Sequence, residues 1–234
     1  AELFDAVVVG EGETALRTLC ERWLTTTPGG STESRPPLAN FAESGGRASS
    51  RAVSECEIVT APPEPLETLA LPHHLYTDAD LAHRTVYVES SRGCPHACAY
   101  CTSAETGLRL IPLGRLLPAF DALWQRGLRR FKFLDRSFNA PAAHAAALLD
   151  FFLARVTPDT RLHFEINADR LHESVASRLA AFPQDTLHLE TGVQTLNPRV
   201  AAAIGRSADT AATLANLRFL THSTRAVVHA DLIF

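Results

Sequence analysis

A regular alternation of strand-like and helix-like runs constrains the fold of this chain more than any other feature. The apolar strand-like runs cover residues 85–90, 130–135, 161–167, 186–194 and 225–234, and the helix-like runs between them cover residues 112–126, 141–155, 171–181 and 209–221. Strands that alternate with helices at a spacing of roughly 30 residues are typical of a parallel sheet wound by right-handed crossovers. We therefore expect an α/β fold, a partial parallel (β/α) barrel that contains about five of the eight strands of a closed barrel.

Three of the expected strands carry polar side chains at every second position. The members of this polar set are His163, Glu165 and Asn167, then His188, Glu190, Gly192 and Gln194, and finally His229 and Asp231. Because side chains alternate between the two faces of a strand, the set lines one face of the sheet. Such a face needs a polar ligand or water if it lines a barrel interior, whereas in a partly open sheet it meets solvent. The ligand-filled interior is favoured, since buried parallel strands are usually covered on both faces.

The stretch "CPHACAYC" follows the first of these strands and holds Cys94, Cys98 and Cys101, with no cysteine downstream. Structural zinc sites need four ligands, and His96 is the nearby fourth donor, although it lies only two residues from both Cys94 and Cys98. Iron–sulfur clusters of four irons take four thiolates, so three leave one iron open to another ligand. A non-catalytic zinc or iron–sulfur module, or a thiol redox protein that uses the Cys98–Cys101 pair, are the alternatives to a catalytic cluster.

The loop spacing, its place after the first strand of a parallel barrel and the aromatic Tyr100 before the last cysteine together resemble the radical S-adenosylmethionine (SAM) superfamily. The resemblance implies a 4Fe–4S cluster on Cys94, Cys98 and Cys101 whose open iron binds the amino and carboxylate groups of SAM. It also implies reductive cleavage of SAM to a 5'-deoxyadenosyl radical that abstracts hydrogen from a substrate. An electron donor such as flavodoxin or ferredoxin is the partner that this chemistry implies.

Three downstream segments resemble the SAM contacts of the same superfamily, and each supplies one candidate residue. "FLDRSFN" resembles the strand end that contacts the methionine amino group, which assigns that role to Asp135. "ETGVQTLNP" is similar to the segment whose acidic residue meets the ribose hydroxyls, so Glu190 takes this role. "IGRSADT" resembles the segment whose arginine pairs with the methionine carboxylate, which makes Arg206 the candidate. Tyr100 resembles the residue that lies against adenine.

The polar strand faces add candidates for substrate contact, namely His163, Glu165 and His229. Each interior histidine is interpreted first as a satisfied interior group rather than a catalytic base, and no catalytic residue is assigned. Lys132 is the single lysine of the chain. If Asp135 points into the barrel, the alternation of side chains turns Lys132 away from it.

The N-terminal stretch "FDAVVVGEGETAL" predicts a strand, a tight glycine turn and a helix. It resembles the last strand and helix of the cobalamin-binding domain that precedes the barrel in one large branch of the superfamily, which includes methyltransferases and methylthiotransferases. We therefore expect the C-terminal end of a Rossmann-like cobalamin-binding domain in residues 1–24 and a Pro/Gly/Ser-rich linker in residues 25–84, with a short extended stretch at "SECEIVT". Residues 85–234 are then the radical SAM core, truncated after about the fifth strand.

By analogy with that branch, the leading reaction class is cobalamin-assisted methylation of an unactivated carbon. Carbon–sulfur bond formation, rearrangement and ring closure stay open, and so does the question whether cobalamin binds.

Composition and charge narrow the possible partners and the possible location of the protein. A formal net charge of −4 without a basic stripe does not support a nucleic-acid partner. Without methionine and with an opening inside a strand-like run, the chain is expected to be a fragment of a longer protein. No apolar run is long enough to span a bilayer and no secretory signal is present, which favours the cytoplasm and reduced thiols. Cys20 is expected to be a small buried apolar residue of the first helix.

Overall fold

A computed structural model describes residues 6–25, 57–103, 107–206 and 209–233. It divides into two compact units, residues 1–65 and residues 66–234. Among the described residues, no helix is long and apolar enough to cross a membrane.

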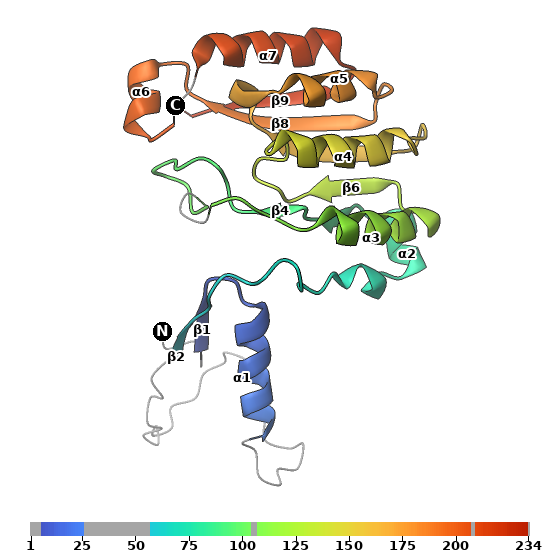
Figure 1. Ribbon diagram of the computed structural model, residues 1–234, viewed down its shortest axis with the longest axis vertical. Coiled ribbons are helices and arrows are strands. Elements are labelled where there is room, and N and C mark those ends of the chain that lie inside the picture. The colour runs from blue at the N-terminus through green and yellow to red at the C-terminus, as the bar shows by residue number, and fades with distance from the viewer. Residues whose placement is uncertain (1–5, 26–56, 104–106, 207–208, 234) are drawn as a thin grey trace, which may run out of the picture. The chain divides into compact units, whose positions relative to one another are not determined.

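The second unit is built on a parallel sheet whose strands follow one another in chain order (Figure 1). The strands are β3 (Val86–Val88), β6 (Arg130–Phe133), β7 (Arg161–Ile166), β8 (Leu187–Gln194) and β9 (Val227–Leu232). All four neighbouring pairs are parallel. This order and direction are those of the first strands of a (β/α) barrel, so the predicted α/β class is confirmed.

The helices between these strands run side by side along one face of the sheet (Figure 1). They are α3 (Leu113–Gln125), α4 (Ala142–Leu153), α5 (Glu173–Ala181) and α7 (Thr210–Ser223). Each lies within a few residues of its expected position. α7 begins where the side chain of Asp209 accepts a hydrogen bond of 3.0 Å from the amide of Ala212, an ordinary N-cap.

The core lies between these helices and the apolar face of the sheet. Phe131 and Phe133 on β6 and Phe164 on β7 are at most 1% exposed, as the alternation along the strands predicts. The ring centroid of Phe120 from α3 lies 5.8 Å from that of Phe133, with the two rings edge to face. Burying each such ring contributes roughly 1.5–3 kcal/mol. The opposite face of the sheet is left to the polar set.

Two small features of the second unit were not expected from the sequence. β4 (Ser91–Arg92) and β5 (Arg109–Leu110) pair antiparallel, and together they close the base of the loop that carries the cysteines. α6 (Pro198–Ala203) follows β8 and begins with Asn197, whose side chain accepts from the amide of Arg199. Strands of two residues and a helix of less than two turns show too little of their period to be detected by pattern.

The expected linker of residues 25–84 lies partly outside the described residues, and the rest of it contains more structure than a linker. β2 (Glu57–Thr60) lies in the stretch that was expected to be extended, whereas η1 (Pro72–Leu75) and α2 (Asp78–His83) were not expected. The side chains of Leu66, Leu69 and Leu81 are buried in the core of the second unit. The guanidinium of Arg115 also donates to the carbonyl oxygen of Leu66 at 2.9 Å. Isolated leucines in a Pro-rich stretch show no period, yet they add apolar burial, which extends the second unit back to Leu66.

The first unit contains β1 (Ala6–Val9), α1 (Glu13–Thr25) and β2, and its two strands pair parallel. The predicted strand, turn and helix are present. Gly10 has φ +107, and a Cβ there would lie 2.5 Å from the carbonyl oxygen of Ala61, so the turn requires glycine. The prediction of a buried Cys20 is wrong, because this side chain is exposed. Among the described residues of α1 only Leu19 is buried.

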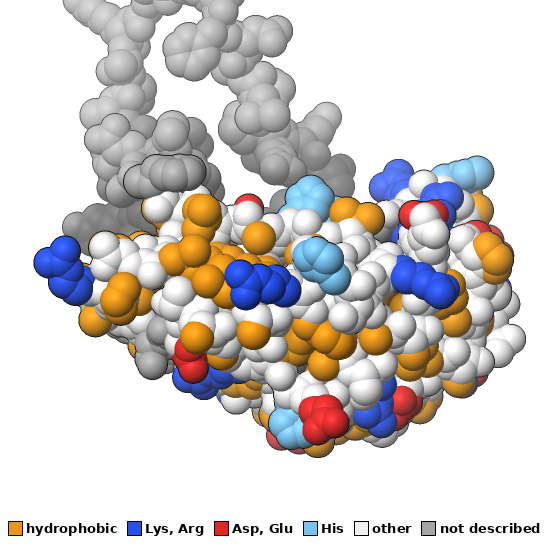
Figure 2. All heavy atoms as spheres, turned by 90° about the horizontal axis from the view of Figure 1, so that it is seen from above, with side chains coloured by type: hydrophobic (Ala, Val, Ile, Leu, Met, Phe, Trp, Pro, Cys, Tyr) orange, Lys and Arg blue, Asp and Glu red, His pale blue; other side chains and the backbone are white. Residues whose placement is uncertain are grey.

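Seen from the side of α7, the surface interleaves apolar side chains with arginine, histidine and acidic groups (Figure 2). This face therefore presents no stripe of one charge, in agreement with the sequence.

Candidate functional site

The cysteine loop lies at the carboxyl ends of the strands, directly after β4. Cys98 is buried, Cys94 is half-buried and Cys101 is exposed. A turn closed by the hydrogen bond from the amide of Cys101 to the carbonyl oxygen of Cys98, 3.0 Å long, sets the spacing of the last two thiols. The sulfur of Cys94 lies 3.4 Å from the hydroxyl oxygen of Ser137, which follows β6. The loop is thus tied to the neighbouring strand end.

A cavity of about 480 Å³ opens beside this loop, at the carboxyl ends of β7 and β8. The predicted site residues that line it are Cys94, Cys98, Cys101, Tyr100, Glu165, Glu190 and Arg206. Seven predicted residues from the cysteine loop, two strands and the segment after α6 therefore meet around one cavity. This is the end of the sheet at which barrel sites form.

Glu190 and Glu165 lie opposite each other on β8 and β7 and form the acidic wall of the cavity. Burial raises the pKa of Glu165, and Glu190 adds to this while Arg136, 3.8 Å away, opposes it. Burial also acts to raise the pKa of Glu190, but His163 and then Lys132 outweigh it, so that this pKa lies below its ordinary value. Glu190 therefore remains a carboxylate at neutral pH.

Arg206 is 7% exposed and borders the cavity from the segment that follows α6. Its guanidinium donates to the side-chain oxygen of Asn167 at 3.4 Å. The amide nitrogen of Asn167 donates in turn to the hydroxyl of Ser137, the residue that contacts Cys94. A buried chain of polar contacts therefore runs from the arginine to the first cysteine.

Asn167 and Ser137 were not predicted as site residues. Asn167 belongs to the polar face of its strand, which was the available signal, whereas the sequence holds no signal for Ser137. Two hydrogen bonds between Asn167 and Asn139, of 2.8 and 2.9 Å, join the ends of β6 and β7.

Asp135 does not border the cavity described for the predicted set. Its carboxylate accepts hydrogen bonds from the amide of Ser90 (2.9 Å), the hydroxyl of Ser90 (2.6 Å) and the hydroxyl of Ser91 (2.5 Å). Burial raises the pKa of Asp135, although these hydrogen bonds oppose the shift. Asp135 lies two residues beyond the end of β6, where these contacts tie it to the residues that follow β3, and its predicted role at the methionine amino group stays a prediction.

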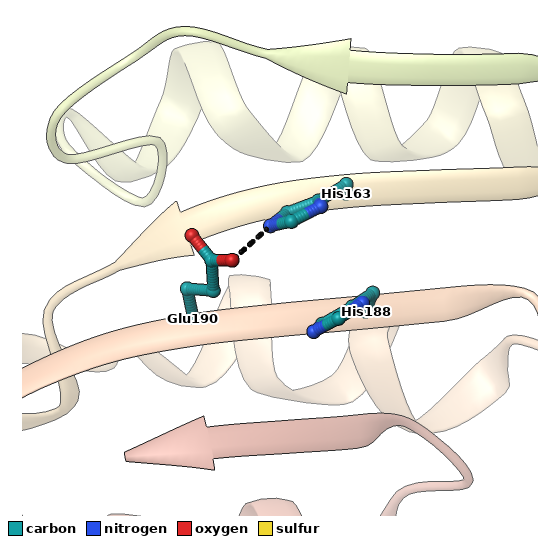
Figure 3. Close-up of side chains that lie close together, drawn as sticks. All are labelled: His163, His188 and Glu190. Atoms are coloured by element: carbon teal, nitrogen blue, oxygen red, sulfur yellow. Dashed lines mark ion pairs between the residues drawn. The ribbon is translucent and has the colours of Figure 1, made fainter. Parts of the chain in front are cut away.

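Lys132 has the opposite phase to the buried phenylalanines of β6 and therefore lies on the polar face, where its ammonium is 3.9 Å from the carboxylate of Glu190. Beside it are His163 and His188, stacked with ring centroids 4.3 Å apart and planes 9° apart (Figure 3). The ring of His229 on β9 follows, 4.6 Å from that of His188. Burial, with His163 and His229 adding, lowers the pKa of His188. The predicted substrate contacts His163 and His229 therefore belong to one row of rings.

A second cavity of about 520 Å³ lies toward the amino ends of the same strands. His163 and His188 line it together with Arg130 and Arg161, whereas Glu165 and Glu190 line the first cavity. The polar face of the sheet therefore connects two hollows of different charge.

Comparison with known proteins gives the family of the chain. Residues 88–231, more than half of the chain, match the family model described as the Radical SAM superfamily. A comparison with curated proteins found no match.

Two solved structures share the fold at low sequence identity. One is the radical S-adenosylmethionine methyltransferase TsrM from Kitasatospora setae with cobalamin and a 4Fe–4S cluster bound, with a TM-score of 0.54 and 18% identity, covering 64% of this chain and 31% of that one. The other is the cobalamin-dependent S-adenosylmethionine radical enzyme OxsB with aqua-cobalamin and S-adenosylmethionine bound, with a TM-score of 0.53 and 15% identity, covering 64% of this chain and 24% of that one. This chain thus spans less than a third of the length of either structure.

Proposed function

The chain belongs to the radical SAM superfamily, and from this premise we propose that it holds a 4Fe–4S cluster and SAM and generates a 5'-deoxyadenosyl radical for an enzymatic reaction. The observation that carries the proposal is the meeting of three cysteines, Glu190 and Arg206 around one cavity of about 480 Å³. A bound cluster and SAM supply the difficult bond chemistry, namely electron transfer to the sulfonium and release of the radical. The chain's own residues hold the cluster, orient SAM and shield the reaction from water.

The thiols fit a cluster better than a single ion. A tetrahedral zinc ion with Zn–S bonds of about 2.3 Å holds its sulfur atoms about 3.8 Å apart. Among the described residues, one group of three metal-binding side chains has donor atoms that all lie within 4.8 Å of one another. That group contains no cysteine. Thiols spread around a cavity suit a cluster, in which each thiolate binds a different iron. Cys94, Cys98 and Cys101 would hold it.

The other residues of the cavity fit the parts of SAM. The buried guanidinium of Arg206 offers a planar pair of donors for the methionine carboxylate. Glu190 offers an ionised carboxylate for the ribose hydroxyls, and the half-exposed ring of Tyr100 offers an apolar surface for adenine. Asp135 is not proposed as a contact, because it does not line this cavity and its carboxylate accepts three hydrogen bonds from Ser90 and Ser91.

For the reaction class we propose cobalamin-dependent methyl transfer. It is supported by the shared fold with TsrM and OxsB and by the parallel strands and glycine turn of the first unit. The proposal includes an electron donor such as flavodoxin or ferredoxin, and it leaves the substrate open between a small molecule and a class not yet known.

The test is an electron paramagnetic resonance spectrum of the anaerobically reconstituted, reduced protein, recorded before and after SAM is added. We expect a cluster signal that shifts with SAM in the wild type. The shift should need a much higher SAM concentration in Arg206→Ala, while the exposed Arg199→Ala serves as the matched control and should behave as the wild type. A cluster signal that SAM does not move, or zinc without a cluster in folded protein, would favour a structural metal module instead.

A further inference from the structure

A second group of metal-binding side chains lies on the polar face of the sheet, away from the cysteine loop. His163 comes from β7, and His188 and Glu190 come from β8 (Figure 3). One donor atom of each residue lies within 4.8 Å of a donor atom of each of the other two. Among the described residues this is the one group of three with that property. His163 and His188 are partners in the strand register, which fixes their separation through the backbone.

The imidazole nitrogens in this group are poorly satisfied. The Nε2 atoms of His163 and His188 are buried, and neither makes a hydrogen bond. Nε2 of His163 lies 2.9 Å from Oε1 of Glu190, a contact that is an ion pair only when the imidazole is protonated. Leaving a buried polar group without a partner is destabilising. Two imidazole nitrogens beside a carboxylate are the arrangement of ligands around a shared cation.

We propose that His163, His188 and Glu190 bind a divalent first-row metal ion of the Zn²⁺ type. Two imidazoles and one carboxylate form the ligand set of catalytic zinc sites, which keep a further coordination position open. The two rings are nearly parallel, so each must turn about its side-chain bonds for both nitrogens to reach one ion. Their partial exposure toward the cavities leaves room for this turn.

The ion would lie between the two cavities, because Glu190 borders the first and both histidines border the second. Its open position would take an oxygen-bearing group of a bound molecule. This role is compatible with the proposed ribose contact of Glu190. Oε1 makes the contacts with His163 and Lys132, so Oε2 is left to accept from a hydroxyl.

The charge of Lys132 should weaken metal binding at this site. Its ammonium lies 3.9 Å from the carboxylate of Glu190 and acts as a competing positive charge. Removing it by Lys132→Gln should tighten metal binding several-fold, because two like charges near one carboxylate repel each other. A purely structural row of stacked rings does not predict this gain.

The experiment is a Co²⁺ titration of the variant Cys94→Ala, Cys98→Ala, Cys101→Ala, followed by visible absorption. We expect d–d bands that saturate near one equivalent, without the sulfur-to-cobalt absorption that thiolate ligands produce. Because the cysteine ligands are removed, the result does not depend on the proposed function.

Replacing either histidine should weaken Co²⁺ binding at least about tenfold, since even outer-shell changes cost 10–100-fold. The matched control is His222→Ala, an exposed histidine at the end of α7, which should leave the affinity unchanged. Absence of the bands, or bands that both histidine variants retain at the same affinity, would overturn the proposal. If circular dichroism shows that the triple variant is unfolded, calorimetric titration of cluster-loaded wild type and His188→Ala with Zn²⁺ gives the same decision.

Discussion

Replacing Gly205 by alanine tests whether the segment after α6 supports the cysteine loop. Gly205 has φ +70, and a Cβ there would lie 2.7 Å from the carbonyl oxygen of Ala97, inside the loop. The neighbouring carbonyl of Ile204 accepts a hydrogen bond of 2.8 Å from the amide of Ala99. The loop therefore rests directly on this segment, at a distance that only glycine permits.

The cost of Gly205→Ala has two parts. Alanine in the left-handed region loses roughly 1–2 kcal/mol. A contact of 2.7 Å with a backbone oxygen also forces one of the two segments to move, and we expect a similar further cost, for a total of about 2–4 kcal/mol. For a chain of this size each kcal/mol lowers Tm by about 2–4 °C. The displaced loop should also hold less iron per chain after reconstitution.

Variants of two other glycines separate the backbone cost from the cost of the close contact. Gly127 has φ +96 with nothing within 4 Å of its Cβ position, so Gly127→Ala carries the backbone cost alone. Gly114, at the start of α3, has neither a positive φ nor a neighbour within 4 Å, and Gly114→Ala should stabilise the protein by about 0.4–1 kcal/mol. Thermal denaturation and iron content are measured for all three. The reasoning is refuted if Gly205→Ala costs no more than Gly127→Ala and binds iron equally well.

Three further predictions concern buried polar groups. Because the pKa of Asp135 is raised in the folded state, that state binds the proton more tightly than the unfolded state does. The free energy of unfolding should therefore fall as pH rises above the unfolded pKa. Urea denaturation of Asp135→Asn should lack this fall with pH. Burial lowers the pKa of His144 below 6.5, so its contribution is lost as pH falls below that value, and His144→Gln should be less acid-sensitive in the same assay. Asn167→Ala leaves Arg206 and Ser137 without their partner and should cost about 1–3 kcal/mol and weaken SAM binding, which denaturation and the SAM-dependent resonance shift measure.

The parallel sheet and its helices could be predicted because burial imposes a period on every element long enough to show one. Phe164 and Leu162 on β7 are buried and His163 and Glu165 are not, as the alternation requires. β4 and β5 could not be predicted, because two residues show no period. Their pairing depends on the return of the chain after the cysteine loop.

Part of the cavity lining could be predicted where a motif marks a strand end, and the rest depends on contacts that a motif does not contain. Glu190 and Arg206 reached the cavity that the cysteines line. Asp135 does not line that cavity; it is buried in the loop after β6 and accepts hydrogen bonds from Ser90 and Ser91. Within β6 the alternation does place Lys132 on the polar face, opposite Phe131 and Phe133. The alternation along β7 marked Asn167 as polar, but its contacts with Ser137 and Arg206 join separate strand ends, which no local pattern contains.

The register of the sheet orders charge along the polar face. Lys132 and His163 are register partners in one row, and Glu165 and Glu190 form the next row toward the carboxyl ends. An acidic row directly below the cysteine loop favours a cation there by Coulomb attraction, strengthened because the wall is partly buried. A sulfonium ligand carries such a positive charge. An anionic substrate group would instead be stabilised more beside the row formed by Lys132 and His163. The two rows would then favour opposite charges, which adds to the contacts proposed for Arg206, Glu190 and Tyr100 in orienting the bound molecules.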